Sequence, residues 1–265
     1  MGLEIKRLRA KWWVFTILSL ILIAPIFFYT TGTELLSDLG QSLAALPDAA
    51  HAALGVSSTT DLTDFVQYQC FVLSFYYAFV ALFACVLGGG ALSSEIGKGT
   101  IGFLYARPVS RGGVVTRKLL ANLFMLILHV LVVMGAAFAL SYLVMPEVLG
   151  IQQVAIAIVT LAMGILLQAI MTFALGFWLS SMMQHAGETV VLAVVMTLVF
   201  AVLGVLARSI SVLEMLAPFI AVTNLSPGFV YQAGIDPLTA GIAAGTTLFL
   251  VILSYMIYSR KNLAL

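Results

Sequence analysis

Six stretches of this sequence, each about twenty residues long or longer, contain no Asp, Glu, Lys or Arg. A helix needs about 20 mostly apolar residues to cross the hydrocarbon core of a bilayer. Because 62% of the residues are apolar and only 9% are charged, the chain cannot hide its apolar surface from water by folding alone. We therefore predict an all-α polytopic membrane protein, a single transmembrane domain over residues 1–265, with six transmembrane helices at about 12–31, 70–92, 119–145, 154–179, 189–207 and 238–258.

The charges between these stretches predict the orientation of the chain. If the start is cytosolic, the inner segments hold eleven of the twelve basic residues, and only Arg208 falls outside. Eight of the eleven acidic residues lie in the outer segments. Cytosolic loops carry an excess of Lys and Arg, and a missed or invented span would scramble this partition. We therefore expect both termini in the cytosol (N-in/C-in), in the cell (plasma or inner) membrane of a prokaryote.

The N-terminal segment could also be a secretory signal peptide, because Lys6, Arg7, Arg9 and Lys11 precede an apolar run. The run is longer than a signal core, and no small-x-small cleavage site follows it. We expect an uncleaved first span.

The longest cytosolic connection, residues 93–118, carries the most informative pattern. Ser93 or Ser94 can cap a short helix that begins at Glu95, and an apolar helix face follows. Pro108 ends this helix, because the residue before a proline resists helical geometry. The pattern predicts a short amphipathic helix on the cytosolic membrane surface. Such a helix can be held by lipid headgroups and have no other function.

The same connection resembles the signature of the type-2 ATP-binding-cassette exporter permeases, in which the helix between spans two and three is a coupling helix that docks into the ATPase. The spacing E-x3-GT-x3-L-x3-PVSR-x6-K carries the resemblance, and the six-span plan with a re-entrant segment before the last span also fits the family. The pre-span segment of eleven residues is shorter than the family's usual connecting helix. Ser110 is also placed to cap the third span. The residues that the resemblance assigns to ATPase coupling are Glu95, Gly99, Thr100, Leu104, Pro108, Ser110, Arg111 and Lys118.

The resemblance also implies partners. These are two cytosolic ATP-binding-cassette ATPase subunits and a second permease, either another copy or a homologue. Gly88, Gly89 and Gly90 lack the Lys-Ser/Thr that follows a phosphate loop, so ATP and Mg are expected on the ATPases and no cofactor on this chain. Membrane lipids are a further expected partner, and nucleic acid is not.

The second cytosolic connection, residues 180–188, contains a Met-Met-x-His cluster. Thioether and imidazole groups suit a soft metal ion. The related permeases have a second, smaller ATPase contact between spans four and five, and we favour this alternative, without a metal, for Met182, His185 and Glu188. Glu188 can also cap the fifth span.

Two outer connections are expected to lie at the membrane surface. Residues 32–69 have a helical, weakly apolar pattern. We expect them to form a lid that lies along the outer membrane surface. Residues 208–237 are apolar but interrupted by prolines, so they are predicted to form a re-entrant or interfacial segment that does not cross. On the last span, Gly241 and Gly245 form a GxxxG face suited to close packing within the subunit or across a dimer.

Polar groups inside the spans are few. His129 and Gln168 lie near the middle of spans three and four, where a polar group is costly unless it is paired inside the bundle. They can line a cargo path or bond neighbouring helices, and both alternatives stay open. The three histidines, at 51, 129 and 185, are too scattered for an acid–base pair or a metal site, so we expect no enzyme activity.

The sequence thus predicts the permease subunit of an ATP-driven exporter. Its uncharged spans favour an apolar or amphiphilic cargo, with a path near spans two and five of paired subunits. An ion-coupled secondary transporter or channel is one alternative, although the spans lack the paired charges typical of ion coupling. A membrane anchor or immunity scaffold without transport is the other.

Overall fold

The computed structural model describes residues 2–47, 50, 51, 54, 56, 60–96, 110–144, 151–209 and 220–260. All regular elements in these residues are helices, and no strand occurs among them. Six helices are long and apolar enough to cross a membrane: Glu4–Thr30, Phe65–Gly89, Arg111–Val144, Gln152–Met182, Ala186–Arg208 and Pro237–Arg260. The prediction of an all-helical protein with six spans is confirmed.

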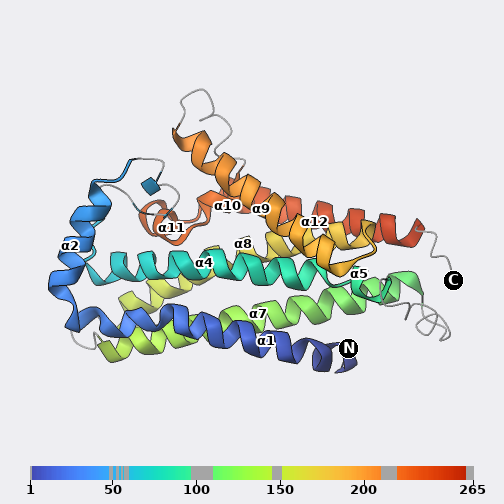
Figure 1. Ribbon diagram of the computed structural model, residues 1–265, viewed down its shortest axis with the longest axis horizontal. Helices are drawn as coiled ribbons and strands as arrows, with labels where there is room; N and C mark the ends of the chain where they lie inside the picture. The colour runs from blue at the N-terminus through green and yellow to red at the C-terminus, as the bar shows by residue number, and fades with distance from the viewer. Residues whose placement is uncertain are drawn as a thin grey trace.

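The long helices lie side by side, and the start of α1 and the end of α12 lie at one end of the bundle (Figure 1). We call this the proximal end, and the opposite end, where α2 and α11 lie, the distal end. In chain order the elements are α1 (Gly2–Ile23), the 3-10 helix η1 (Ala24–Thr31), α2 (Thr33–Ala44), α4 (Phe65–Gly89), α5 (Ser93–Ile96), α7 (Arg111–Val144), α8 (Ile151–Met182), α9 (Ala186–Ser209), α10 (Ala221–Asn224), α11 (Pro227–Ala233) and α12 (Pro237–Arg260).

The spanning helices extend beyond the apolar stretches of the sequence, because capping groups and not hydropathy fix their ends. The carboxylate of Asp64 accepts the backbone N–H of Gln67 at 3.0 Å, so α4 begins before the predicted second span. The hydroxyl of Ser110 accepts the backbone N–H of Gly113 at 3.2 Å, which confirms the predicted cap and places the start of α7 at Arg111.

The first span changes geometry in its last third. It is α-helical from Gly2, so the basic N-terminal segment is continuous with it, and it becomes a 3-10 helix at Ala24. Pro25 lacks the N–H that would continue the α-helical bonding. The Pro25 carbonyl accepts a hydrogen bond from the hydroxyl of Tyr68 at 2.8 Å, which holds η1 against α4.

Helix α8 packs against α4, α7, α9 and α12 and so lies at the centre of the bundle. It approaches α4 closely because glycines occupy the crossing. A Cβ on Gly88 would lie 2.8 Å from the Phe177 nitrogen, and one on Gly176 would lie 2.9 Å from the Gly89 nitrogen. The backbones of the two helices are therefore in direct contact.

The GxxxG face of α12 has a different environment. No described atom lies within 4 Å of a Cβ added to Gly241 or Gly245, apart from their own helix and neighbours. The described part of the subunit therefore does not pack against this face, which is accessible to lipid or to another chain.

Short helices cover the distal end. α2 lies crosswise to the spans (Figure 1), which confirms helical character for part of the predicted lid. α10 and α11 are too short to cross, as predicted for the segment before the last span, and they pack against α9 and α8. Residues 210–219 of that segment lie outside the described residues.

Candidate functional site

The predicted coupling connection starts just after the proximal end of α4. Hydrogen bonds to Ser180 of α8 hold the start of the connection. The hydroxyl of Ser180 accepts the backbone N–H groups of Leu92 at 2.8 Å and Ser93 at 2.9 Å. The hydroxyl of Ser93 donates to the Gly89 carbonyl at 2.6 Å. α5 therefore begins at Ser93, two residues before the predicted Glu95, and its first N–H group donates to a hydroxyl on α8.

Most of the predicted coupling residues are not placed. Glu95 belongs to α5, but its side chain lies outside what the structure describes, as do Gly99, Thr100, Leu104 and Pro108. The amphipathic coupling helix stays a prediction.

The end of the same connection is described, and it is joined to α12. Arg111 donates from Nη1 to the Ser259 carbonyl at 3.0 Å. One turn further along α7, the hydroxyls of Thr116 and Tyr255 lie 2.8 Å apart. A cation at the C-terminal end of a helix is favoured by the helix dipole, so Arg111 stabilises the proximal end of α12.

Lys118, also assigned to coupling, points into the bundle. It is 3% exposed, and its Nζ donates to the Ala91 carbonyl at 2.8 Å and lies 3.6 Å from the Glu4 carboxylate. The side chain thus connects α7 to the start of α1 and to the residues just after α4. Lys118, the last residue of the coupling connection, thus contacts the residues just before the connection from inside the protein.

The turn between α8 and α9 also lies at the proximal end. Met182 is the last residue of α8, and Met182, His185 and Glu188 are all exposed. Glu188 lies in the first turn of α9, where a carboxylate interacts favourably with the helix dipole. The described residues contain no group of three or more His, Cys, Asp or Glu side chains that could hold a metal ion.

His129 is fully buried where α1, α4 and α7 meet. Its Nδ1 lies 2.9 Å from the hydroxyl of Thr16, and its Nε2 lies 3.3 Å from the hydroxyl of Ser19. The Phe83 ring lies 4.6 Å from the imidazole, centroid to centroid. Both ring nitrogens therefore have partners on α1, which is the arrangement expected of a residue that bonds neighbouring helices.

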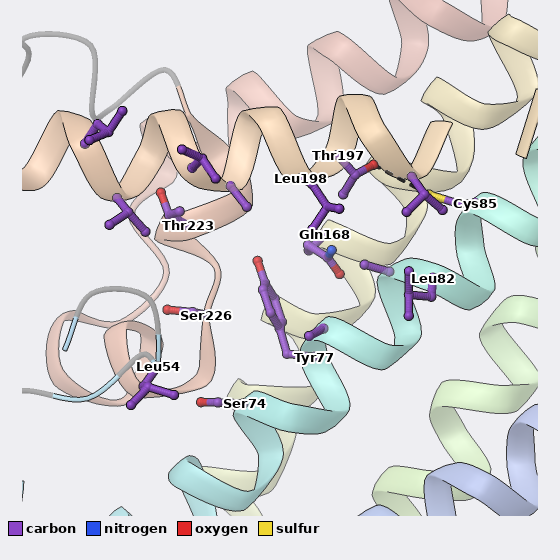
Figure 2. Close-up of a pocket in the computed structure, with 17 residues that line it drawn as sticks. Leu54, Ser74, Tyr77, Leu82, Cys85, Gln168, Thr197, Leu198, Thr223 and Ser226 are labelled. Atoms are coloured by element: carbon purple, nitrogen blue, oxygen red, sulfur yellow. Dashed lines mark hydrogen bonds between the residues drawn. The ribbon is translucent and has the colours of Figure 1, made fainter. Parts of the chain in front are cut away.

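Gln168, by contrast, lines a cavity of about 350 Å³ between α4, α8 and α9. Figure 2 shows its amide between Tyr77 and Thr197. The side chain is fully buried, its Nε2 donates to the Thr172 hydroxyl at 3.3 Å, and its Oε1 has no hydrogen-bond partner. Of the two predicted cargo-path residues, the structure thus places Gln168 at this cavity and His129 in a separate contact.

Sequence reasoning overlooked several residues that join the helices. Thr16 and Ser19 are three apart in the apolar first half of the first span, and this helical spacing is a signal that could have paired them with His129. Arg208 was visible as the one basic residue in the outer segments. Nothing in the sequence singles out Ser180, because its partners lie 87 and 88 residues away along the chain.

Comparison with known protein families gives a match over nearly the whole chain. Residues 2–263 match the family model described as "ABC-2 family transporter protein". No curated protein matches the chain.

Proposed function

The chain belongs to the ABC-2 family of transporter proteins, and we propose that it is the membrane-spanning permease subunit of an ATP-driven exporter. The observation that carries the proposal is the extent of the family match, which includes all six spans. A permease of this kind takes its energy from ATP hydrolysed by a partner chain.

We assign the proximal end to the cytosol and to the ATPases. The start of α1, the end of α12 and α5 lie at this end of the bundle (Figure 1), and eleven of the twelve basic residues fall in the segments predicted to be inner. Two cytosolic ATPase subunits, with ATP and Mg, would bind the coupling connection and the turn between α8 and α9. A second permease, identical or homologous, completes the assembly in a prokaryotic inner membrane.

The lining of the spans supports an apolar or amphiphilic cargo. The predicted spans carry no formal charge. The cavity at Gln168 is lined mainly by Leu, Val and Ala, and the polar groups along it include an amide, a phenol and hydroxyls. Apolar walls of this kind raise a barrier to hydrated ions.

Purification of the tagged chain from its native membranes tests the proposed assembly. We expect an ATP-binding-cassette ATPase to copurify. The double variant Glu95→Ala with Leu104→Asp should insert normally but lose the ATPase, whereas Asp38→Asn, in α2 at the distal end, should keep it. If the double variant retains the ATPase and its cargo-stimulated hydrolysis, the connection is an interfacial helix without a coupling function. Absence of any copurifying ATPase would contradict the proposal that the chain is part of an ATP-driven exporter.

Reconstituted vesicles test the cargo class. Hydrolysis by the complex should rise with hydrophobic peptides or lipids and not with monovalent or divalent ions. Ion flux with ion-stimulated hydrolysis, unaffected by amphiphiles, would favour an ion transporter instead.

A further inference from the structure

The cavity at Gln168, which we call the α4–α9 cavity, forms where α9 diverges from α4. At the proximal end the two helices are in contact, because a Cβ on Gly89 would lie 3.0 Å from the Val190 side chain. Slightly further along, the Cys85 thiol and the Thr197 hydroxyl lie 3.5 Å apart. Towards the distal end α9 leans away (Figure 1), and Thr223 and Ser226 line the far part of the cavity (Figure 2).

The cavity is elongated and opens sideways. Its lining follows α9 from Val194 to Leu206, about 18 Å at the helical rise. Leu198 and Val202 line it and are each 57% exposed, so one side opens on the lateral surface of the bundle. In a bilayer this surface of a single subunit faces lipid chains, and an acyl chain can therefore move into the cavity without crossing a polar region.

Gln168 provides a hydrogen-bonding group in the middle of these apolar walls. Only one of its two terminal amide atoms faces the Thr172 hydroxyl, so turning the amide over would still leave the other atom unpaired. An unpaired polar atom that is fully buried is unfavourable. A hydroxyl on a bound chain can both donate to an amide oxygen and accept from an amide N–H, so it would satisfy this group in either orientation.

Arg208 provides a positive charge just beyond the last α9 residue that lines the distal end of the cavity. It follows the lining residue Val205 by three positions and so lies on the same face of α9. Its Nη2 donates to the Asn224 side-chain oxygen at 2.6 Å, and its guanidinium lies 4.2 Å from the centroid of the Phe229 ring. Among the described residues no carboxylate forms an ion pair with it. A guanidinium has five N–H donors and binds carboxylates and phosphates well.

We propose that the α4–α9 cavity binds a single-chain anionic amphiphile that carries a hydroxyl on its chain. The acidic headgroup binds Arg208, the chain lies along α9, and the hydroxyl reaches Gln168. Figure 2 places Gln168 beside Thr197 and Leu198, and Thr197 lies about 16 Å from Arg208 along the helix. As an identification of the cargo, this inference rests on the proposed function, but the binding can be measured without an ATPase.

The test is equilibrium binding of radiolabelled ricinoleate, a hydroxylated fatty acid, to the full chain in discs of zwitterionic lipid. We expect saturable binding. Arg208→Gln should weaken it about tenfold or more, through loss of a charge-assisted hydrogen bond. Ricinoleyl alcohol, which lacks the charge, should bind this variant and the unmodified chain equally. Gln168→Leu should weaken ricinoleate binding about threefold to tenfold and leave oleate, which lacks the hydroxyl, unaffected.

Two matched variants act as controls. Arg260→Gln, at the proximal end, should bind ricinoleate as the unmodified chain does. Arg208→Lys keeps the charge and should retain most of the binding, which separates a specific effect from misfolding. Absence of saturable binding, or equal losses in Arg208→Gln and Arg260→Gln, would overturn the proposal.

Competition and hydrolysis distinguish the remaining outcomes. If phosphatidylglycerol displaces ricinoleate with the same dependence on Arg208, the occupant is a membrane phospholipid and the single-chain class is wrong. If amphiphiles stimulate ATP hydrolysis equally in complexes with the unmodified chain and with Arg208→Gln, the proposed exporter function is supported and the proposed binding site is wrong. If ricinoleate binds as predicted but stimulates nothing, the site stands and its role in cargo transport is wrong.

Discussion

The ammonium nitrogen of Lys118 lies 2.8 Å from the carbonyl oxygen of Ala91, which lies between the end of α4 and the start of the coupling connection. A buried lysine is costly unless its donors are used and its charge is balanced. The Ala91 carbonyl uses one donor, and the Glu4 carboxylate lies 3.6 Å away. This contact joins the N-terminal part of α1 to Ala91, two residues before the coupling connection.

Replacing Lys118 should therefore destabilise the bundle. Lys118→Met keeps much of the side-chain volume but removes the hydrogen bond to Ala91, and we expect a loss of about 1.5–3 kcal/mol in the free energy of unfolding. Denaturation of the purified protein in mild detergent measures it. Lys6→Met, which removes an exposed charge from α1, should change stability by less than about 0.5 kcal/mol. Equal effects of the two changes would show that the Lys118 contact does not contribute.

Ser180 should control how firmly the coupling connection is held. Ser180→Ala removes the acceptor for the N–H groups of Leu92 and Ser93, at a cost of about 1–3 kcal/mol for the groups left unpaired. We expect weaker ATPase retention during purification. Ser254→Ala is the matched control, because that buried hydroxyl donates to Leu250 in its own helix. Unchanged ATPase retention in Ser180→Ala would show that the hydrogen bonds of Ser180 do not contribute to ATPase binding.

The number of spans was predictable because apolar length and charge asymmetry are local properties of the sequence. The helix ends were less predictable where a cap lies several residues outside the apolar stretch, as Asp64 does for α4. Ser110 was identified in advance because a capping hydroxyl immediately before a helix is itself a local signal.

Contacts between distant segments were not predictable in the same way. Lys118 fits a family motif, yet its burial depends on how α1 and α4 pack beside α7. The sequence identified His129 and Gln168 as equivalent polar groups in the middle of spans. Thr16 and Ser19 on α1 pair with the first, whereas the divergence of α9 from α4 leaves a cavity beside the second.

The His129 contact can be measured by a double-mutant cycle. Thr16→Val and His129→Phe each remove one side of the 2.9 Å hydrogen bond. Hydrogen bonds between membrane helices average about 0.6 kcal/mol in such cycles, and we expect a coupling energy between about 0.6 and 1.7 kcal/mol. Phe in place of His can still pack against Phe83. A coupling energy near zero, together with altered cargo selectivity in His129→Phe, would favour the cargo-path alternative.

The orientation can be tested by labelling engineered cysteines with an impermeant thiol reagent in intact cells. Cysteines at Asp61 or Asp236 should react, because both positions precede a span at the distal end and are exposed. A cysteine at Lys98, in the coupling connection, should react only after the cells are opened. Native Cys70 and Cys85 are buried and should give little background. Labelling of Lys98→Cys in intact cells would overturn the proposed orientation.

Two glycine pairs in this chain should respond oppositely to the same substitution. Gly88→Ala would bring a Cβ within 2.8 Å of the Phe177 backbone nitrogen, and Gly176→Ala would create a similar clash with Gly89, so α4 and α8 would have to separate. Separation of closely packed helices loses dispersion contacts along the whole crossing. We expect either variant to lower the melting temperature in detergent and the yield of folded protein.

Gly241→Ala and Gly245→Ala are the comparison, because an added Cβ there meets no described atom within 4 Å. Alanine has a higher helix propensity than glycine by about 1 kcal/mol, so the isolated subunit should keep or gain stability. Cross-linking in membranes then tests what this face contacts. If both variants leave the isolated chain stable but weaken cross-linking between permeases, the face is a subunit contact. If cross-linking is unchanged, the glycines face lipid, and a GxxxG pattern in this family member has no packing role.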